Sequence, residues 1–129
     1  RERRRLATRR AEARHATDGS QELALHEVRK AAKRARYAAE AAGPVIGRPA
    51  RRFADAVSDV QTVLGDHQDT VILRATLRRM GAQAFLAGEN GFTFGLLHAR
   101  EEQRAAQAER DFARAWKSVS RRRINRWLD

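Results

Sequence analysis

The chain has 129 residues and holds 27 Lys plus Arg against 16 Asp plus Glu, which gives a formal net charge of +11. That length suits one domain with a hydrophobic core, and so large a positive excess favours a polyanionic partner. The absence of cysteine excludes disulfides and thiolate metal sites and is compatible with the cytoplasm. No apolar run approaches the roughly 20 residues that span a membrane, so we expect no membrane partner.

The positive charge is concentrated near the start of the chain. Residues 1–52 carry a net charge of +9, residues 53–99 carry −2 and residues 100–129 carry +4. The basic character therefore belongs to particular segments and not to the whole surface.

Abundant Ala, Arg, Glu and Leu favour helix along nearly the whole chain. Three stretches break the pattern: TDGS at 17–20, with Ser20 as the candidate N-cap, GPVIGRP at 43–49, and GENG at 88–91. The remaining segments are about 1–16, 20–42, 49–87 and 92–127. They predict an all-α fold, an antiparallel up-down four-helix bundle with long helices, in a single domain over 1–129.

Two glycines fall inside the long third segment. Gly65 costs about 1 kcal/mol relative to Ala in a helix interior, so we expect a kink or a close helix contact near it. Gly81 is expected to mark the frayed end of the helix.

The string LHEVRKAAKRARYAAE, residues 25–40, places two stripes on one helix. The apolar stripe recurs every three or four residues, the period of a helix, and consists of Leu25, Val28, Ala32, Ala35, Ala39 and Ala42. A polar stripe follows one residue later, about 100° around the helix, and consists of His26, Arg29, Lys33, Arg36 and Glu40. Lys30 and Tyr37 fall on that same side. Like charges one turn apart destabilise a helix by a few tenths of a kcal/mol per pair. A bound polyanion would offset that cost. The alternative interpretation of the polar stripe is a solvated face with local ion pairs.

Three strings together carry a resemblance to a known family. The first is LHEVRKAAKRARYAAE, with His, then Arg three residues on, Lys or Arg at the following turns, and Tyr. The second, FADAVSDVQTVLGDHQDTVIL, contains an L-G-x-x-x-D pattern, and the third is GLLHAREEQRAAQAERDFARAWK. Over about 20–117 the chain resembles a CHAD domain, the conserved histidine α-helical domain. Members of that family are usually two four-helix bundles related by pseudo-symmetry, and this chain resembles the second bundle, so it corresponds to half of such a domain.

The resemblance implies non-catalytic binding of inorganic polyphosphate, in the cytoplasm and in association with polyphosphate granules. The matching binding positions are His26, Arg29, Lys30, Lys33, Arg36 and Tyr37. The residue chemistry agrees, because a row of Lys and Arg suits a repeating anion and Arg can engage phosphate oxygens bidentately. Family members are sometimes fused to triphosphate-processing domains, so an accessory domain of a phosphate-processing enzyme is an alternative.

Two further arginines and two further partners follow from the charge and the family pattern. Arg5 and Arg9 lie one turn apart in the basic first segment, and we expect both to face the binding groove. A basic helical nucleic-acid-binding domain is the alternative that charge alone supports, although no aromatic residue alternates with basic ones as in a base-stacking platform. A homodimer through the face left vacant by a missing second bundle is a further hypothesis.

The remaining candidates have weaker signals. His26 could be an interior histidine, and His98, in a leucine-rich turn, is expected in the core. Asp66, His67 and Asp69 resemble a metal cluster only weakly, so we expect no metal site. The sequence contains no Gly-rich phosphate loop and no nucleophile–base arrangement, so we expect neither an enzyme nor a cofactor.

Overall fold

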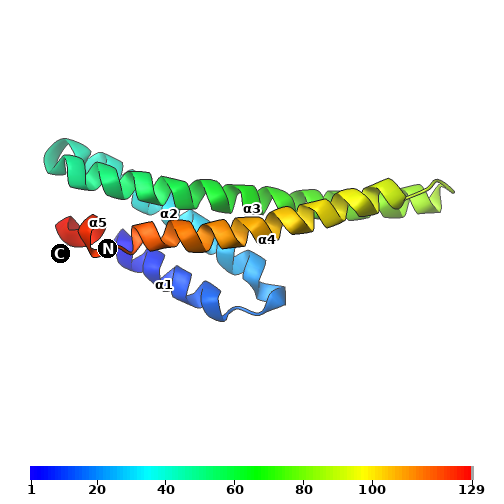
Figure 1. Ribbon diagram of the computed structural model, residues 1–129, viewed down its shortest axis with the longest axis horizontal. Coiled ribbons are helices and arrows are strands. Elements are labelled where there is room, and N and C mark those ends of the chain that lie inside the picture. Colours follow the sequence, from blue (N-terminus) through cyan, green and yellow to red (C-terminus); the bar gives the residue numbers. More distant parts are fainter. Residues whose placement is uncertain (129) are drawn as a thin grey trace.

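The computed structural model describes residues 1–128, so Asp129, the last residue of the expected domain, lies outside the described part. The elements are α1 (Glu2–His15), α2 (Asp18–Ile46), α3 (Arg48–Leu86), α4 (Phe92–Val119), the short α5 (Arg122–Asn125) and a closing 3-10 turn (Arg126–Leu128). The four long helices alternate in direction, and each packs against the next one along the chain (Figure 1). The predicted all-α bundle of long helices is confirmed.

The turn between α1 and α2 is shorter than the sequence predicts. Ala16 and Thr17 are extended, and Thr17 is the N-cap of α2. Ser20 lies inside the first turn, where its hydroxyl donates to the Thr17 carbonyl at 3.2 Å. The prediction of Ser20 as N-cap is wrong, because two extended residues are enough to reverse the chain.

The break between α2 and α3 is confined to one residue. The sequence predicts that GPVIGRP interrupts the helix throughout, yet α2 continues through Pro44 to Ile46. Pro44 removes one backbone N–H close to the helix end, and Pro49 occupies the first turn of α3, where the N–H has no intrahelical partner. Gly47, at φ 77°, makes the reversal, and its N–H donates to the Gly43 carbonyl at 2.8 Å.

The two glycines inside α3 mark close approaches. α3 runs unbroken through Gly65 and Gly81 to Leu86, so the prediction of a frayed end at Gly81 is wrong. A Cβ on Gly81 would lie 3.3 Å from the Cβ of Phe94 in α4, and one on Gly65 would lie 3.9 Å from the Nε of Arg29 in α2. The close contact expected at Gly65 is therefore present.

The last predicted helix is too long. α4 ends at Val119, where the amide of Asn125 donates to the Val119 carbonyl at 2.7 Å and to the Arg121 carbonyl at 3.0 Å. The chain then turns back, and the Trp127 ring meets the Phe53 ring edge-on at a centroid distance of 6.0 Å. A single buried amide thus ends the helix and returns the chain to the bundle.

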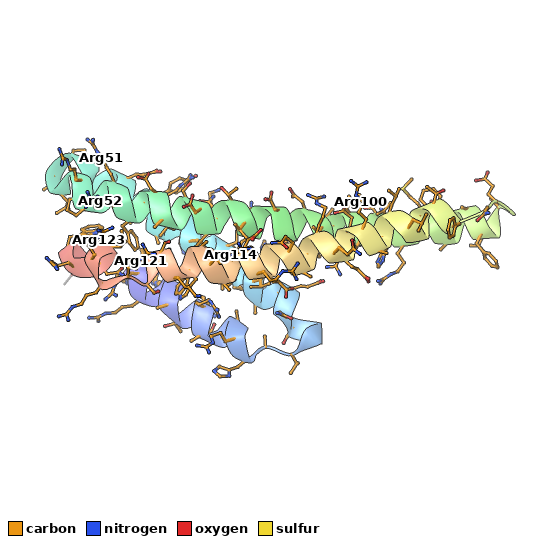
Figure 2. All side chains as sticks on the ribbon, in the orientation of Figure 1. Arg51, Arg52, Arg100, Arg114, Arg121 and Arg123 are labelled. Atoms are coloured by element: carbon orange, nitrogen blue, oxygen red, sulfur yellow. The ribbon has the colours of Figure 1, made fainter. Side chains whose placement is uncertain are left out.

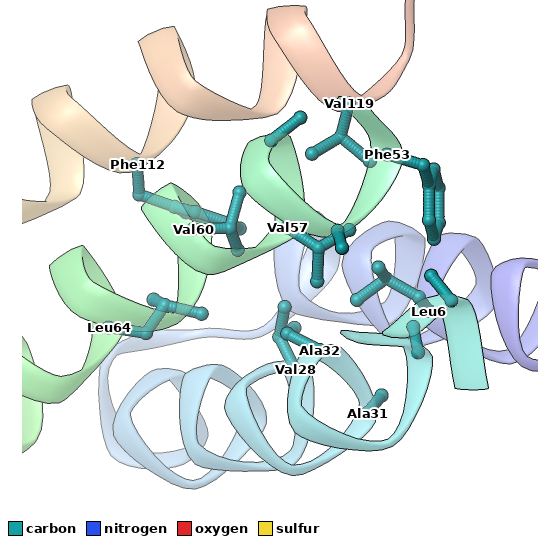
Figure 3. Packing of buried hydrophobic residues seen from close by; sticks show 14 of the residues in the cluster. Leu6, Val28, Ala31, Ala32, Phe53, Val57, Val60, Leu64, Phe112 and Val119 are labelled. Atoms are coloured by element: carbon teal, nitrogen blue, oxygen red, sulfur yellow. The ribbon is translucent and has the colours of Figure 1, made fainter. Parts of the chain in front are cut away.

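The core lies where all four long helices meet (Figure 3). Leu6 of α1, Val28 of α2, and Val57 and Val60 of α3 are fully buried, and Phe112 contributes from α4. Alanines fill the α2 side of this core, so the neighbouring helices can approach closely. Removing one of the large side chains would cost about 2–5 kcal/mol, so α2 is held firmly at its apolar stripe.

Beyond the bundle, α3 and α4 continue as a two-helix hairpin that α1 and α2 do not cover (Figure 1). The hairpin exposes Phe85, Leu86 and Phe92 near its tip. Among the described residues, no helix is long and apolar enough to cross a membrane.

Candidate functional site

The two stripes predicted on α2 occupy different faces of the helix. The apolar stripe from Leu25 to Ala39 is buried, and Ala42 is half-buried. On the polar side, His26, Arg29 and Arg36 are half-buried, whereas Lys30, Lys33 and Tyr37 are exposed. The bundle therefore positions every residue of this basic stripe (His26, Arg29, Lys30, Lys33, Arg36 and Tyr37) along one side of a well-anchored helix.

Acidic residues neutralise only part of the basic stripe. Lys30 Nζ lies 2.8 Å from Glu27 Oε1, and Arg36 Nε lies 3.4 Å from Glu40 Oε1. Arg29 and Lys33 have no ion-pair partner among the described residues. The middle of the stripe is thus a pair of cations without a counter-charge.

Several polar atoms of the stripe are covered by protein and lack a hydrogen-bond partner in the described part of the chain. They are His26 Nδ1, Arg29 Nε and Arg36 Nε. Arg29 Nε lies beside Gly65 of α3, where a Cβ would stand 3.9 Å from it, an ordinary contact distance. Unsatisfied buried donors cost stability, and because these atoms are covered, a ligand on this face would contact the other atoms of the two guanidinium groups.

Tyr37 orders two of the cations. The Arg36 guanidinium carbon lies 5.0 Å from the centroid of the Tyr37 ring and Lys33 Nζ lies 5.8 Å from it, both within cation–π range. Tyr37 is half exposed. Its ring therefore holds neighbouring cations toward the same side without neutralising them.

Arg5 and Arg9 line a different surface from the stripe. Both border an open cleft of about 1080 Å³, whose other walls include Arg4 of α1 and Arg34 of α2. Glu2 and Glu12 pair with Arg5 and Arg9 at 3.0 and 2.8 Å. The hydrogen bond to Glu12 raises the pKa of Arg9 above its ordinary value.

Sequence reasoning missed Arg34 and Arg10. Arg34 Nε lies 3.8 Å from Glu2 Oε2 and joins α2 to the α1 cleft. Arg10 points inward, with its guanidinium carbon 5.0 Å from the Phe112 ring centroid, and burial together with Arg14 lowers its pKa. A helical projection of residues 2–15 places Arg10 near Leu6 and Ala13, a signal that could have identified it.

His67 and His98 lie between α3 and α4. His67 is buried and its Nε2 lies 3.3 Å from Glu109 Oε1 of α4, while Asp66 and Asp69 are exposed. Within the described residues, no group of three His, Cys, Asp or Glu could hold a metal ion. His98, expected in the core, is instead half-buried, beside Arg78 Nη2 at 3.3 Å and Glu102 Oε1 at 3.6 Å.

Comparison with known proteins gives a family but no assigned activity. Two uncharacterized proteins of Mycobacterium tuberculosis, from strains CDC 1551 / Oshkosh and ATCC 25618 / H37Rv, are each 37% identical over 106 residues. The match covers 82% of this chain but only 20% of each relative, so the chain spans about a fifth of their length. No solved structure matches the chain significantly. The CHAD domain model matches residues 1–78, more than half of the chain, and the chain therefore belongs to the CHAD domain family.

Proposed function

We propose that this protein binds inorganic polyphosphate along the basic stripe of α2. The observation that carries the proposal is the pair Arg29 and Lys33, which lie side by side on a rigid helix without an acidic partner among the described residues. A ligand rich in anionic oxygens would supply the missing counter-charge to both side chains.

The spacing of the stripe favours a repeating anion over a single phosphate. From His26 to Arg36 the helix rises about 15 Å, so several units of an extended phosphate chain would contact the cations together. Arg can engage phosphate oxygens through two donors, and Lys acts as a mobile point charge. The proposal involves binding alone, with no bond made or broken.

A charge-matched pair of triple variants tests the site. Replacing Arg29, Lys33 and Arg36 with Gln removes three charges from the stripe, and Gln is a good helix former. Replacing Arg78, Arg79 and Arg100 with Gln removes three charges from the exposed hairpin, where Arg100 is visible in Figure 2. Titration with long-chain polyphosphate should show a loss of about 100-fold for the stripe variant, since three partly exposed charged contacts of about 1 kcal/mol each sum to about 3 kcal/mol.

The hairpin variant should lose far less affinity than the stripe variant. Equal losses would mean that net charge alone governs binding and would refute the stripe as the site. Competition with duplex and single-stranded DNA at moderate salt separates the alternative function, since nucleic acid binding also weakens as salt rises. DNA that displaces polyphosphate effectively would favour a nucleic-acid-binding domain.

A further inference from the structure

The α1 cleft is the second strongly basic surface of the molecule. Among the described residues that line it, six are arginines and one is a glutamate. Arg4, Arg5 and Arg9 contribute from successive turns of α1, and Arg34 reaches in from α2. These arginines place positive charges around an open cleft, and such a cleft favours an anionic ligand.

Two acidic residues near the cleft, Glu2 and Glu12, pair with three of its arginines and leave Arg1 and Arg4 without an ion pair among the described residues. Glu2 is shared, since its Oε1 lies 3.0 Å from Arg5 Nη1 and its Oε2 lies 3.8 Å from Arg34 Nε. Glu12 forms an ion pair with Arg9. Arg4 is exposed and has no ion-pair partner within the described part of the chain. The cleft therefore retains cations that can bind a ligand without breaking an existing pair.

The cleft and the basic stripe are connected along α2. Arg34 follows Lys33 directly, about 100° around the helix, and lies one turn beyond Lys30. Lys30 Nζ lies 2.8 Å from Glu27 Oε1. The positive charge of Arg9 also acts on Glu27 and helps to lower its pKa. Cations thus extend from the stripe, around the polar side of α2, to the outer face of α1.

We propose that the α1 cleft is a second anion subsite that continues the stripe, so that the protein selects long phosphate chains over short ones. This inference rests on the function proposed above. A chain held at the stripe would meet the cleft at a high effective concentration, and its second contact would add affinity without a second association step. A short chain would occupy the stripe alone.

The test compares two ligands across three charge-matched variants. The ligands are tripolyphosphate and a size-fractionated long-chain polyphosphate. The cleft variant replaces Arg4, Arg5 and Arg9 with Gln, and the stripe and hairpin variants are those described above. Calorimetric titration gives the affinities, and circular dichroism verifies that each variant keeps its helices.

The wild-type protein should bind the long chain more tightly than tripolyphosphate. The cleft variant should lose about tenfold or more in affinity for the long chain, as three exposed charged contacts would predict, and less than about threefold for tripolyphosphate. The stripe variant should lose affinity for both ligands. The loss in the cleft variant that is confined to the long chain supports the second subsite, and the other two results support the stripe.

Three outcomes overturn the inference. A cleft variant that binds the long chain no worse than the hairpin variant shows that the cleft makes no contact. Equal losses for both ligands show that the cleft and the stripe form one compact site, and equal wild-type affinities remove the length selection. The function proposed above fails separately, if the stripe variant binds both ligands as the hairpin variant does.

Discussion

α2 and α4 hold the same charges in different arrangements. Each helix contains five Lys or Arg and four Asp or Glu. In α4 three arginines each donate a hydrogen bond of 2.7–2.8 Å to a residue one turn earlier: Arg104 to Glu101, Arg110 to Gln107 and Arg114 to Asp111. In α2 the cations gather on one face, and Glu22 pairs instead with Arg74 of α3 at 2.7 Å.

The two helices differ in how their unpaired cations are placed: among the described residues, Arg100 and Lys117 of α4 also have no ion pair but lie far apart along the helix, whereas Arg29 and Lys33 of α2 lie one turn apart. A cation with an acid one turn away has its charge screened and its donors occupied, and the pair stabilises the helix by only about 0.2–0.5 kcal/mol. Arg29 and Lys33 lack that local partner within the described chain, so their donors and charges remain available. The placement of the acids therefore decides whether neighbouring cations on a helix stay unpaired.

Giving α2 the pattern of α4 should produce the largest effect. The double change His26→Glu and Lys30→Glu places acids one turn before Arg29 and Lys33. Polyphosphate affinity should fall by about 100-fold or more, because two cations become paired and two stripe residues become acidic. Thermal unfolding should show a Tm close to that of the wild type, because the two new pairs offset the loss of the Lys30–Glu27 pair. Retained affinity would show that unpaired cations are not what binds.

Pairing one cation from the neighbouring helix should give an intermediate effect. Gly65→Glu places a carboxylate beside Arg29, whose Nε lies 3.9 Å from the position of the new Cβ. We expect a fivefold to tenfold loss of polyphosphate affinity, about 1 kcal/mol, by titration. Gly65→Ala is the matched control: its Cβ makes an ordinary contact and should stabilise the helix by about 0.5–1 kcal/mol with affinity unchanged.

Freeing a cation on each helix should give a smaller and unequal gain. Glu27→Gln releases Lys30 on α2, and Asp111→Asn releases Arg114 on α4, each with the loss of one negative charge. Affinity for polyphosphate should rise about twofold to fivefold for the first change and less than about twofold for the second. Equal gains in affinity would indicate that binding responds to total charge and that α2 and α4 do not differ as binding surfaces.

The smallest effect concerns acid stability at Glu27. The hydrogen bond from Lys30, with the charges of Lys30 and Arg9, holds the pKa of Glu27 below its ordinary value. A carboxylate with a lower pKa in the folded state stabilises the fold above its unfolded pKa, and that stabilisation is lost as pH falls through the folded pKa. The Tm of the wild type should therefore fall slightly more than that of Glu27→Gln between about pH 6 and about pH 3. Identical slopes would show that this exposed pair contributes nothing to stability.

The sequence was sufficient to predict the helices and the two faces of α2. Apolar residues at a period near 3.6 can be buried together only on a helix, and so Leu25, Val28 and Ala32 identified the core face before any contact was known. The remaining errors lie at helix ends. Ser20, Pro44 and Gly81 have the local chemistry of a cap or a break, yet a helix continues through each of them. The chain already reverses before Ser20, Pro44 removes only one N–H near the helix end, and Gly81 lies against Phe94 of α4.

The partners of the charged residues were decided only by the tertiary structure. Periodicity places Arg29, Lys33, Arg5 and Arg9 on helix surfaces, but it cannot say which acid from another helix comes near them. Arg74 pairs with Glu22, which lies 52 positions away in the sequence, and Arg34 of α2 pairs with Glu2 of α1. Ion pairs depend on separations of a few ångströms, which the chain acquires only when helices distant in sequence pack together; the same packing leaves Arg29 beside a glycine.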